Sequence, residues 1–162
     1  MTKDSIFSLD ISSKSTGWCY TVKNRIYNFG VIKIKIALDR AEKLVIFRHE
    51  LVKLLNKYKP ECVVIENGFA GRNISTLKTL SKFAGVGEEC AKSITGNSPY
   101  IMSNKTPKAC FEVKTKEELY HVIVKKFKLK DFKYDTHNDI TDSIAQALCY
   151  YNEVVKERKN GD

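Results

Sequence analysis

The sequence has no long apolar run. After the first few residues comes an apolar stretch of only about six residues, whereas a membrane-crossing helix needs roughly 20. A secretory signal also needs a longer apolar core than this stretch provides. We therefore expect a cytoplasmic protein without a membrane segment.

The sequence also has no metal-binding pattern of cysteine and histidine. No histidine lies close to a cysteine in a zinc-type spacing, and there is no C-x-x-C pair. The cysteines are widely spaced, at Cys19, Cys62, Cys90, Cys110 and Cys149. We expect most of them to be small buried side chains in a reducing compartment.

Acidic residues are few relative to basic ones. The chain has 28 Lys and Arg against 19 Asp and Glu, a net charge of +9 and a pI near 9.3. This excess favours a polyanionic partner such as nucleic acid or an anionic membrane, although it also serves solubility. A length of 162 residues, 43% of them hydrophobic, predicts one folded domain over residues 1–162. Some lysines are expected to form a solvated surface that faces phosphates: Lys125, Lys126, Lys128, Lys130 and Lys133.

Apolar runs and their periodicity predict the order of the elements. Strands are expected over residues 6–11, 17–22 and 26–34, as an antiparallel meander, and over 62–65 and 100–102. Helices are expected over residues 38–58, 74–94, 116–127 and 141–155, with another helix start at Thr106 and Pro107. The unbroken run 62–65 is typical of a parallel strand in mid-sheet. This order predicts an α/β fold, a mixed five-stranded sheet with helices on both faces.

Two of the helices have notable features. In residues 38–58 the predicted inward stripe includes Ala41 and Val45. In residues 74–94, Gly85 and Gly87 each weaken the helix by about 1 kcal/mol and suit close approach of another helix.

Four carboxylates stand at unusual positions. Asp10 lies in an apolar strand, where an unpaired charge costs several kcal/mol, so we expect a cationic partner. Glu66 follows a buried run at the carboxyl end of a mid-sheet strand. Asp139 and Asp142 are three residues apart at the start of the last predicted helix and so share a face. Each alone also has an ordinary interpretation, as a lysine partner, a strand end or a helix N-terminal charge.

Taken together, the four carboxylates predict a metal site. They would repel one another unless divalent cations neutralised them, and oxygen ligands without His or Cys fit Mg²⁺ or Mn²⁺. Two such ions would activate water and stabilise the leaving oxygen of a phosphodiester. The predicted ligands are Asp10, Glu66, Asp139 and Asp142.

Several segments carry the motifs of a known family. Residues 9–18 read L-D-I-S-S-K-S-T-G-W, an Asp followed by Thr-Gly-aromatic. Residues 64–73 read V-I-E-N-G-F-A-G-R-N, a strand-end Glu before a loop with an aromatic, a basic residue and an Asn. Residues 138–147 contain D-x-x-D-[AS]-hydrophobic-A. In these motifs, their order and their spacing, the chain resembles the RuvC family of Holliday junction resolvases, within the RNase H-like superfamily. One departure is Ile11-Ser12, where the family usually has Pro-Gly.

The resemblance implies a homodimeric, Mg²⁺-dependent endonuclease with two ions per site, Mn²⁺ being an alternative. It would resolve four-way junctions and related branched DNA by paired symmetric nicks in recombination and repair, leaving 5′-phosphate and 3′-hydroxyl ends. The four carboxylates would be catalytic, and residues 76–86 would form the dimer-interface helix. A lysine-rich copy of this kind would suit a bacteriophage or a low-GC bacterium.

The resemblance also implies roles for basic and loop residues. Lys116 would be catalytic and lie close to the scissile phosphate, with Lys108 as a second basic residue. Phe69 would stack on an unpaired base, a contact of about 1–3 kcal/mol, and Arg72 and Asn73 would contact DNA.

Other interpretations stay open at this point. Another RNase H-like nuclease would cut RNA–DNA hybrids or flaps, and a non-catalytic protein would bind branched DNA with structural acids. An actin-like or sugar-kinase-like ATPase also begins with an Asp on its first strand, but that architecture duplicates the domain. His137, next to Asn138, is either a general base, a metal neighbour or a structural residue.

Overall fold

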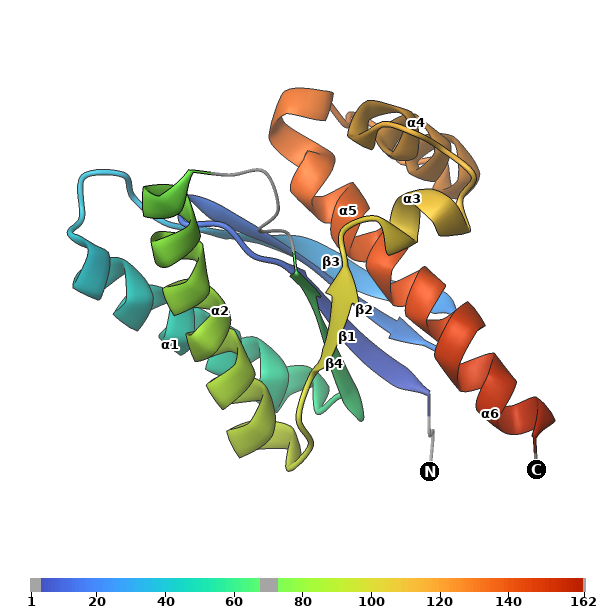
Figure 1. The fold of residues 1–162 in the computed structure, drawn as a ribbon, viewed down its shortest axis with the longest axis horizontal. Coiled ribbons are helices and arrows are strands. Elements are labelled where there is room, and N and C mark those ends of the chain that lie inside the picture. Colours follow the sequence, from blue (N-terminus) through green and yellow to red (C-terminus); the bar gives the residue numbers. More distant parts are fainter. Residues whose placement is uncertain (1–3, 68–72, 162) are drawn as a thin grey trace.

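A mixed five-stranded sheet forms the centre of the computed structural model, which describes residues 4–67 and 73–161 (Figure 1). The strand order is β3-β2-β1-β4-β5, with antiparallel pairing from β1 to β3 and parallel pairing from β1 through β4 to β5. The strands are β1 (Ser5–Asp10), β2 (Ser15–Val22), β3 (Arg25–Lys33), β4 (Cys62–Asn67) and β5 (Tyr100–Ser103). The predicted α/β fold with its mid-sheet parallel strand is confirmed.

Helices cover both faces of this sheet. In Figure 1, α1 and α2 lie on one face, and α5 crosses the other with α3 and α4 beside it. The helices are α1 (Arg40–Tyr58), α2 (Ile74–Thr95), α3 (Thr106–Cys110), α4 (Lys116–Phe127), α5 (Tyr134–Tyr150), the π-helix η1 (Tyr151–Val155) and α6 (Lys156–Asn160). None of these described helices is long and apolar enough to cross a membrane.

The side chains of β1 point alternately to the two faces of the sheet. Phe7 and Leu9 belong to the core under α1 and α2, whereas Ile6 packs with residues of α5. Ser8, on the Ile6 side, donates a hydrogen bond to the carbonyl oxygen of Ser143 in α5. Because successive side chains of a strand point to opposite faces, Asp10 shares the α5 face with Ile6 and Ser8. The strand thus places the Asp10 carboxylate beside the helix that holds two of the other predicted acids, Asp139 and Asp142.

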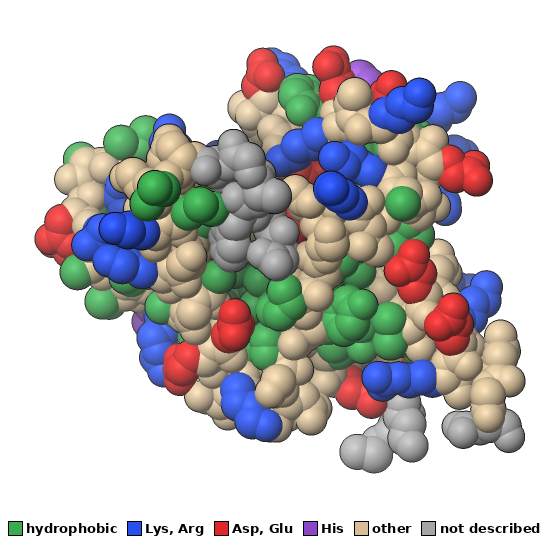
Figure 2. Space-filling model, in the orientation of Figure 1, with side chains coloured by type: hydrophobic (Ala, Val, Ile, Leu, Met, Phe, Trp, Pro, Cys, Tyr) green, Lys and Arg blue, Asp and Glu red, His purple; other side chains and the backbone are tan. Residues whose placement is uncertain are grey.

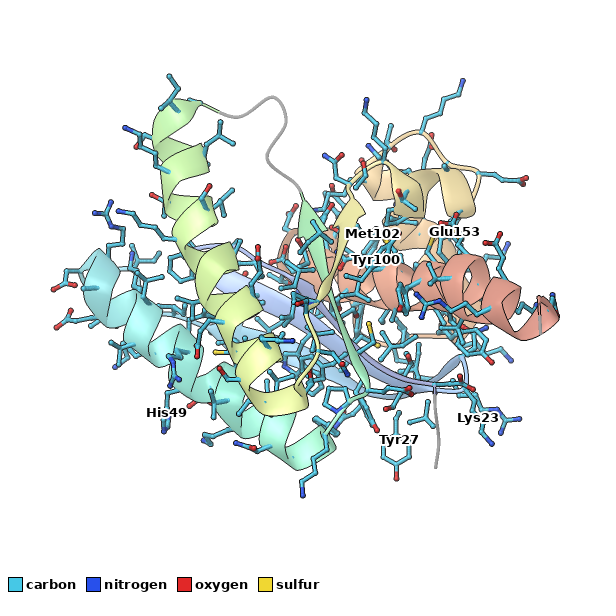
Figure 3. All side chains as sticks on the ribbon, turned by 60° about the horizontal axis from the view of Figure 1, so that its bottom comes forward. Lys23, Tyr27, His49, Tyr100, Met102 and Glu153 are labelled. Atoms are coloured by element: carbon cyan, nitrogen blue, oxygen red, sulfur yellow. The ribbon has the colours of Figure 1, made fainter. Side chains whose placement is uncertain are left out.

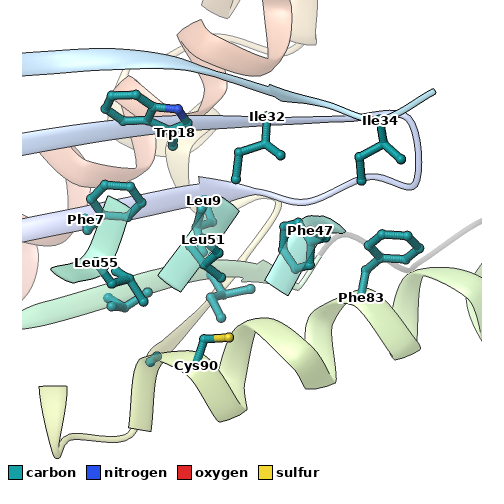
Figure 4. Close-up of a cluster of buried hydrophobic side chains, with 13 residues drawn as sticks. Phe7, Leu9, Trp18, Ile32, Ile34, Phe47, Leu51, Leu55, Phe83 and Cys90 are labelled. Carbon is teal, nitrogen blue, oxygen red and sulfur yellow. The ribbon is translucent and has the colours of Figure 1, made fainter. Parts of the chain in front are cut away.

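The core between the sheet and the first two helices is built from large side chains. Figure 4 shows Phe7, Leu9 and Trp18 of the sheet above Phe47, Leu51 and Leu55 of α1. These α1 residues recur every fourth position and are fully buried. The predicted α1 stripe is wrong at Ala41 and Val45, which are exposed, because Phe47 and its i+4 neighbours define the buried face.

The last helix begins earlier than predicted. The sequence placed its start at Thr141, but α5 begins at Tyr134. Polar side chains bond to the backbone near the new start: the Asn138 side chain donates to the Tyr134 carbonyl oxygen, and His137 Nδ1 accepts from the Lys133 N–H at 3.0 Å. The His137 ring also stacks on Phe132, so its contacts are structural. Asp139 and Asp142 therefore lie past the first turn and are not helix N-terminal charges.

Gly87 of α2 has different surroundings from those predicted. A Cβ on Gly87 would lie 3.0 Å from Ile11 Cδ1 and 3.4 Å from Ile65 Cδ1. Gly87 therefore allows close approach of the sheet side chains and not of another helix. Gly85 has no atom within 4 Å of its Cβ position and faces open space.

At Gly17, the backbone of β2 approaches the backbone of α5 closely. A Cβ there would lie 2.0 Å from the Asp139 carbonyl oxygen and 2.8 Å from the Ile140 nitrogen, both backbone atoms that cannot rotate away. We expect Gly17→Ala to lower the free energy of unfolding by about 3 kcal/mol, measured by urea denaturation. Gly85→Ala is the matched control and is expected to leave stability unchanged or raise it by up to about 1 kcal/mol. Equal stability of the two variants would contradict this account of the β2–α5 contact.

Candidate active site

Two carboxylates reach the site from adjacent parallel strands. Asp10 is the last residue of β1, and Glu66 lies near the carboxyl end of β4. The register pairs Leu9 with Ile65. Asp10 and Glu66 are the next residues on their strands, so they lie at the same level of the sheet. Val64 belongs to the core on the α5 side, and Glu66 shares its parity along β4. The two carboxylates therefore face α5 from neighbouring strands.

The other two predicted acids come from α5. Asp142 is buried, with its side chain 9% exposed, and it lies near Asp10. Asp139 is half-buried, and its Oδ2 atom accepts a hydrogen bond of 2.7 Å from Ser15 Oγ at the start of β2. Ser12 shapes the preceding turn, because its hydroxyl accepts from the Ser15 N–H at 3.0 Å. This turn therefore stays closed although Ser12 stands where the family that the chain resembles usually has glycine.

Lys116 supplies the cation that the buried Asp10 required. Its Nζ atom, at the first residue of α4, lies 2.7 Å from Asp142 Oδ2 and 3.9 Å from Asp10 Oδ2. The side chain is 45% exposed, so the ammonium group bridges the buried carboxylates and solvent. The expectation of a cationic partner for Asp10 is met by this contact.

The proton affinities of these groups follow from burial and mutual repulsion. Burial raises the pKa of Asp10 well above its usual range, and the charges of Glu66 and Asp142 raise it further. Burial also raises the pKa of Asp142 to about 6, against the opposing charge of Lys116. For Lys116, burial lowers the pKa, but the charges of Asp10 and Asp142 outweigh it and leave the pKa above its usual value. The cluster holds more negative charge than one lysine neutralises.

These side chains line one open cavity of about 130 Å³. Its walls include Asp10, Glu66, Lys108, Lys116, Asp142 and Gln146. Asp139 does not line it, although its charge contributes to the raised pKa of Lys116. Figure 2 shows basic side chains gathered over α3 and α4, beside a hollow in which acidic side chains are visible. An anionic ligand would meet positive charge before reaching the carboxylates.

The donor set fits a divalent cation with oxygen ligands. Asp10 Oδ2 and Asp142 Oδ1 are buried and accept no hydrogen bond, which leaves two ligand atoms free. No three of the four acids have oxygen atoms within 4.8 Å of one another in the described part of the chain. The Lys116 ammonium instead occupies the space beside Asp10 and Asp142. Carboxylates alone, without His or Cys, favour Mg²⁺ or Mn²⁺.

Of the remaining predicted residues, Asn73 alone lies within the described part of the chain. Asn73 is exposed at the N-cap of α2, where its side chain accepts from the Thr76 N–H at 2.8 Å. Phe69 and Arg72 lie outside the described residues. Their predicted contacts with DNA stay predictions.

Two polar residues of the site were missed in the sequence. Gln146 is fully buried, and its Nε2 atom donates to Glu66 Oε2 at 3.4 Å. Ser15, described above, holds Asp139. The available signal for Gln146 was that a polar side chain stands at a position on the buried face of the helix. Its partner could not be identified, because the two residues are far apart in sequence.

Comparison with known proteins decides the family. The family profile described as crossover junction endodeoxyribonuclease RuvC matches residues 6–150. The chain belongs to the RuvC family. The match contains all four acids, Lys108, Lys116 and Gln146.

Two curated RuvC proteins are similar to this chain along most of their length. Crossover junction endodeoxyribonuclease RuvC of Halothermothrix orenii is 23% identical over 143 residues, covering 86% of this chain and 84% of the relative. RuvC of Thermomicrobium roseum is 23% identical over 133 residues, covering 78% of each chain.

Solved structures of RuvC-type proteins share the fold. The chain superposes on the Thermus thermophilus RuvC in complex with Holliday junction substrate with a TM-score of 0.76, at 18% identity, over 91% of this chain and 94% of that one. The yeast mitochondrial Holliday junction resolvase gives a TM-score of 0.60 at 16% identity, over 96% and 82% of the two chains. The predicted RNase H-like fold is confirmed by these superpositions.

Gln146 offers a test of how Glu66 is held in this RuvC-family site. Gln146→Met keeps the volume but removes the amide donor to Glu66. We expect cleavage of branched DNA to fall about 10–100-fold, as on loss of a group that orients a ligand, with stability unchanged or raised. The stability gain follows from removing Gln146 Oε1, a buried atom without a hydrogen-bond partner.

The matched control for Gln146 is Thr141→Val. Thr141 is also buried in α5, but its hydroxyl donates to the Asn138 carbonyl oxygen of its own helix. We expect this variant to keep its cleavage rate. Equal rates for wild type and Gln146→Met, measured by single-turnover cleavage, would remove Gln146 from the positioning of Glu66.

Proposed function

We propose that the chain resolves four-way DNA junctions, and related branched DNA, as a Mg²⁺-dependent homodimer that makes paired symmetric nicks. The observation that carries this proposal is the convergence of Asp10, Glu66, Asp142 and Lys116 on one open cavity. Membership of the RuvC family supports the choice of substrate, since its members are crossover junction endodeoxyribonucleases.

Asp10, Glu66 and Asp142 would hold the metal, with Asp139 as a fourth carboxylate fixed by Ser15. Divalent ions bound there, two per site in this proposal, would supply Lewis-acid activation of water and charge stabilisation for the leaving oxygen. The buried oxygens Asp10 Oδ2 and Asp142 Oδ1 accept no hydrogen bond, which supports this assignment because such buried acceptors are rare in proteins. Mn²⁺ has the same ligand preference and is the alternative ion.

Lysines of the cavity would handle the phosphate. Lys116 is charged well above neutral pH, and its partly exposed ammonium can contact a phosphoryl oxygen while it still touches Asp142. Preorganised positive charge of this kind stabilises the transition state without reorganisation. Lys108 lines the same cavity from α3. The lysines that continue along α4 and the segment after it would bind the DNA backbone and make binding salt-dependent.

Exposed apolar side chains of α1, α2 and the segment before α1 support the dimer. They are Val45 at 68%, Ile74 at 71% and Ile36 at 73% exposed. A two-fold dimer would place two identical sites so that both strands of a symmetric junction are nicked. Sedimentation equilibrium of the wild type and of Val45→Lys tests this face, with weaker dimerisation expected for the variant.

The deciding experiment compares substrates. An end-labelled synthetic four-way junction is incubated beside linear duplex, flap and RNA–DNA hybrid, each with Mg²⁺ and with EDTA. We expect paired, metal-dependent nicks confined to the junction, with 5′-phosphate and 3′-hydroxyl ends. Preferential cutting of the hybrid or flap would reassign the chain to another RNase H-like activity. Tight junction binding without cutting at any Mg²⁺ concentration would identify a non-catalytic binding protein.

A further inference from the structure

Two thiols and a carboxylate converge away from the acidic cavity, where α3, α5 and η1 meet. The Sγ atoms of Cys110 and Cys149 and a carboxylate oxygen of Glu153 all lie within 4.8 Å of one another. Among the residues that the structure describes, no other three His, Cys, Asp or Glu side chains are so close. The spacing of the cysteines in the sequence gave no sign of this cluster.

The three donors run from the core to the surface. Cys149 is fully buried and Cys110 half-buried, whereas Glu153 is exposed. Glu153 lies on the side of the C-terminal helix that faces α3, which Figure 3 shows. A ligand at this cluster would therefore be held by the protein on its inner side and reach solvent on its outer side.

The backbone is unusual at the same place. Tyr151–Val155 form a π-helix, and the Lys156 N–H bonds to the Tyr151 carbonyl oxygen five residues back. Such wide turns are rare within α-helices and occur frequently at functional sites. Glu153 lies in the middle of this turn, four residues after Cys149 and so on the same face of the helix. The irregular turn and the side-chain cluster are independent observations that coincide.

The donor chemistry differs from that of the acidic cavity. Two sulfur ligands and one carboxylate suit a borderline or soft cation such as Zn²⁺, and not Mg²⁺. Three protein ligands leave one tetrahedral position for water. Without a cation, burial raises the pKa of the Cys149 thiol, and the neighbouring Cys110 thiol and Glu153 carboxylate raise it further. A bound cation would reverse this preference for the protonated thiol.

We propose that Cys110, Cys149 and Glu153 bind one thiophilic divalent cation of the Zn²⁺ class and thereby fasten α3 to the C-terminal helix. Binding forms two metal–sulfur bonds and one metal–oxygen bond and releases the two thiol protons to solvent, with no change of oxidation state. Lys108 lies two residues before Cys110 on α3 and lines the catalytic cavity. The ion would therefore fix the position of α3, the helix that carries Lys108. Binding of this ion does not depend on the proposed nuclease activity.

The test uses the whole chain, freed of metal by a chelator and kept reduced by a phosphine. Co²⁺ is titrated first, because a thiolate ligand gives a near-ultraviolet charge-transfer band that carboxylate ligands do not give. We expect this band to saturate at one Co²⁺ per chain and to vanish when Zn²⁺ is added. Zn²⁺ in 100-fold excess over its Kd is expected to raise Tm by about 5–10 °C.

Two variants and one control assign the site. Cys110→Ser is expected to abolish the charge-transfer band. Glu153→Gln changes an exposed side chain and so leaves folding intact, and we expect it to weaken Co²⁺ binding at least about 10-fold. Glu157→Gln, exposed on the following turn, is the matched control and is expected to bind as wild type. Absence of the band in wild type, or equal affinity in wild type and Glu153→Gln, overturns the site. Formation of a Cys110–Cys149 disulfide in the reducing buffer would also overturn the site, because neither thiol would then be free to bind a cation.

Discussion

Asp142→Asn is expected to abolish junction cleavage while junction binding stays intact or becomes stronger. Asparagine keeps the shape of the side chain but removes the charge that a divalent ion requires, so the loss should exceed the roughly 10²–10³-fold effect of removing one preorganised contact. Binding should not suffer, because it depends mainly on positive charge near the phosphates, and the variant has one negative charge fewer. Single-turnover cleavage and gel-shift titration at fixed salt measure the two effects.

Asp135→Asn is the matched control for this experiment. It makes the same substitution in the same helix, but Asp135 is exposed and does not line the cavity. We expect wild-type cleavage from this variant. If Asp142→Asn lost binding and cleavage to the same extent, Asp142 would have a folding role, and the catalytic assignment of the acidic cavity would fail.

The strands and most helices could be predicted because local signals coincide with them. Helix α4 begins at Lys116 as expected, where Thr115 and Glu118 cap each other across the helix start. The start of α5 was missed because His137 and Asn138 are weak helix formers. Their side chains instead bond to the backbone at Lys133 and Tyr134, and this compensation cannot be deduced from propensity.

Asp10 could be singled out in the sequence because charge in a buried strand is costly wherever the strand lies in the fold. The partners that hold the other acids could not be predicted. Ser15 reaches Asp139, and Gln146 reaches Glu66, only through the packing of α5 on β2 and β4. The meeting of Cys110 with Cys149 likewise depends on how α3 lies against α5. Contacts of this kind have no local signal, since they join elements that are distant in the chain.

The acidic cavity also predicts an unusual dependence of stability on pH in the absence of metal. Asp142 has a folded-state pKa of about 6 against an ordinary 3.8, and the pKa of Asp10 is raised as well. A raised carboxyl pKa means that the folded state binds the proton more tightly. The resulting stabilisation is complete below the ordinary pKa and is lost as pH rises through the folded-state value. In EDTA, stability should therefore fall between pH 5 and pH 7, by about 1 kcal/mol from Asp142 alone.

Asp10→Asn should make the metal-free protein more stable at pH 7.5, by about 1–3 kcal/mol or roughly 2–10 °C in Tm. The variant removes a buried charge that Glu66 and Asp142 repel, while Lys116 keeps its closer contact with Asp142. The gain should shrink towards pH 5, where the wild-type carboxyl groups hold protons. Mg²⁺ should raise the Tm of wild type and not of Asp10→Asn, because the ion binds the ionised carboxylates.

Calorimetry separates the effect of the Asp10 charge on Tm from the effect of Mg²⁺ binding. It compares the wild type, Asp10→Asn and Asp139→Asn, each at pH 5 and 7.5 with Mg²⁺ or EDTA. Asp139→Asn serves for comparison, since Ser15 already satisfies that half-buried carboxylate and its removal relieves little repulsion. A metal-free Asp10→Asn protein less stable than wild type at pH 7.5 would mean that the Lys116 contact outweighs burial and repulsion at Asp10. The carboxylates would then stabilise the fold without metal. The argument that their mutual repulsion points to a metal site would fail.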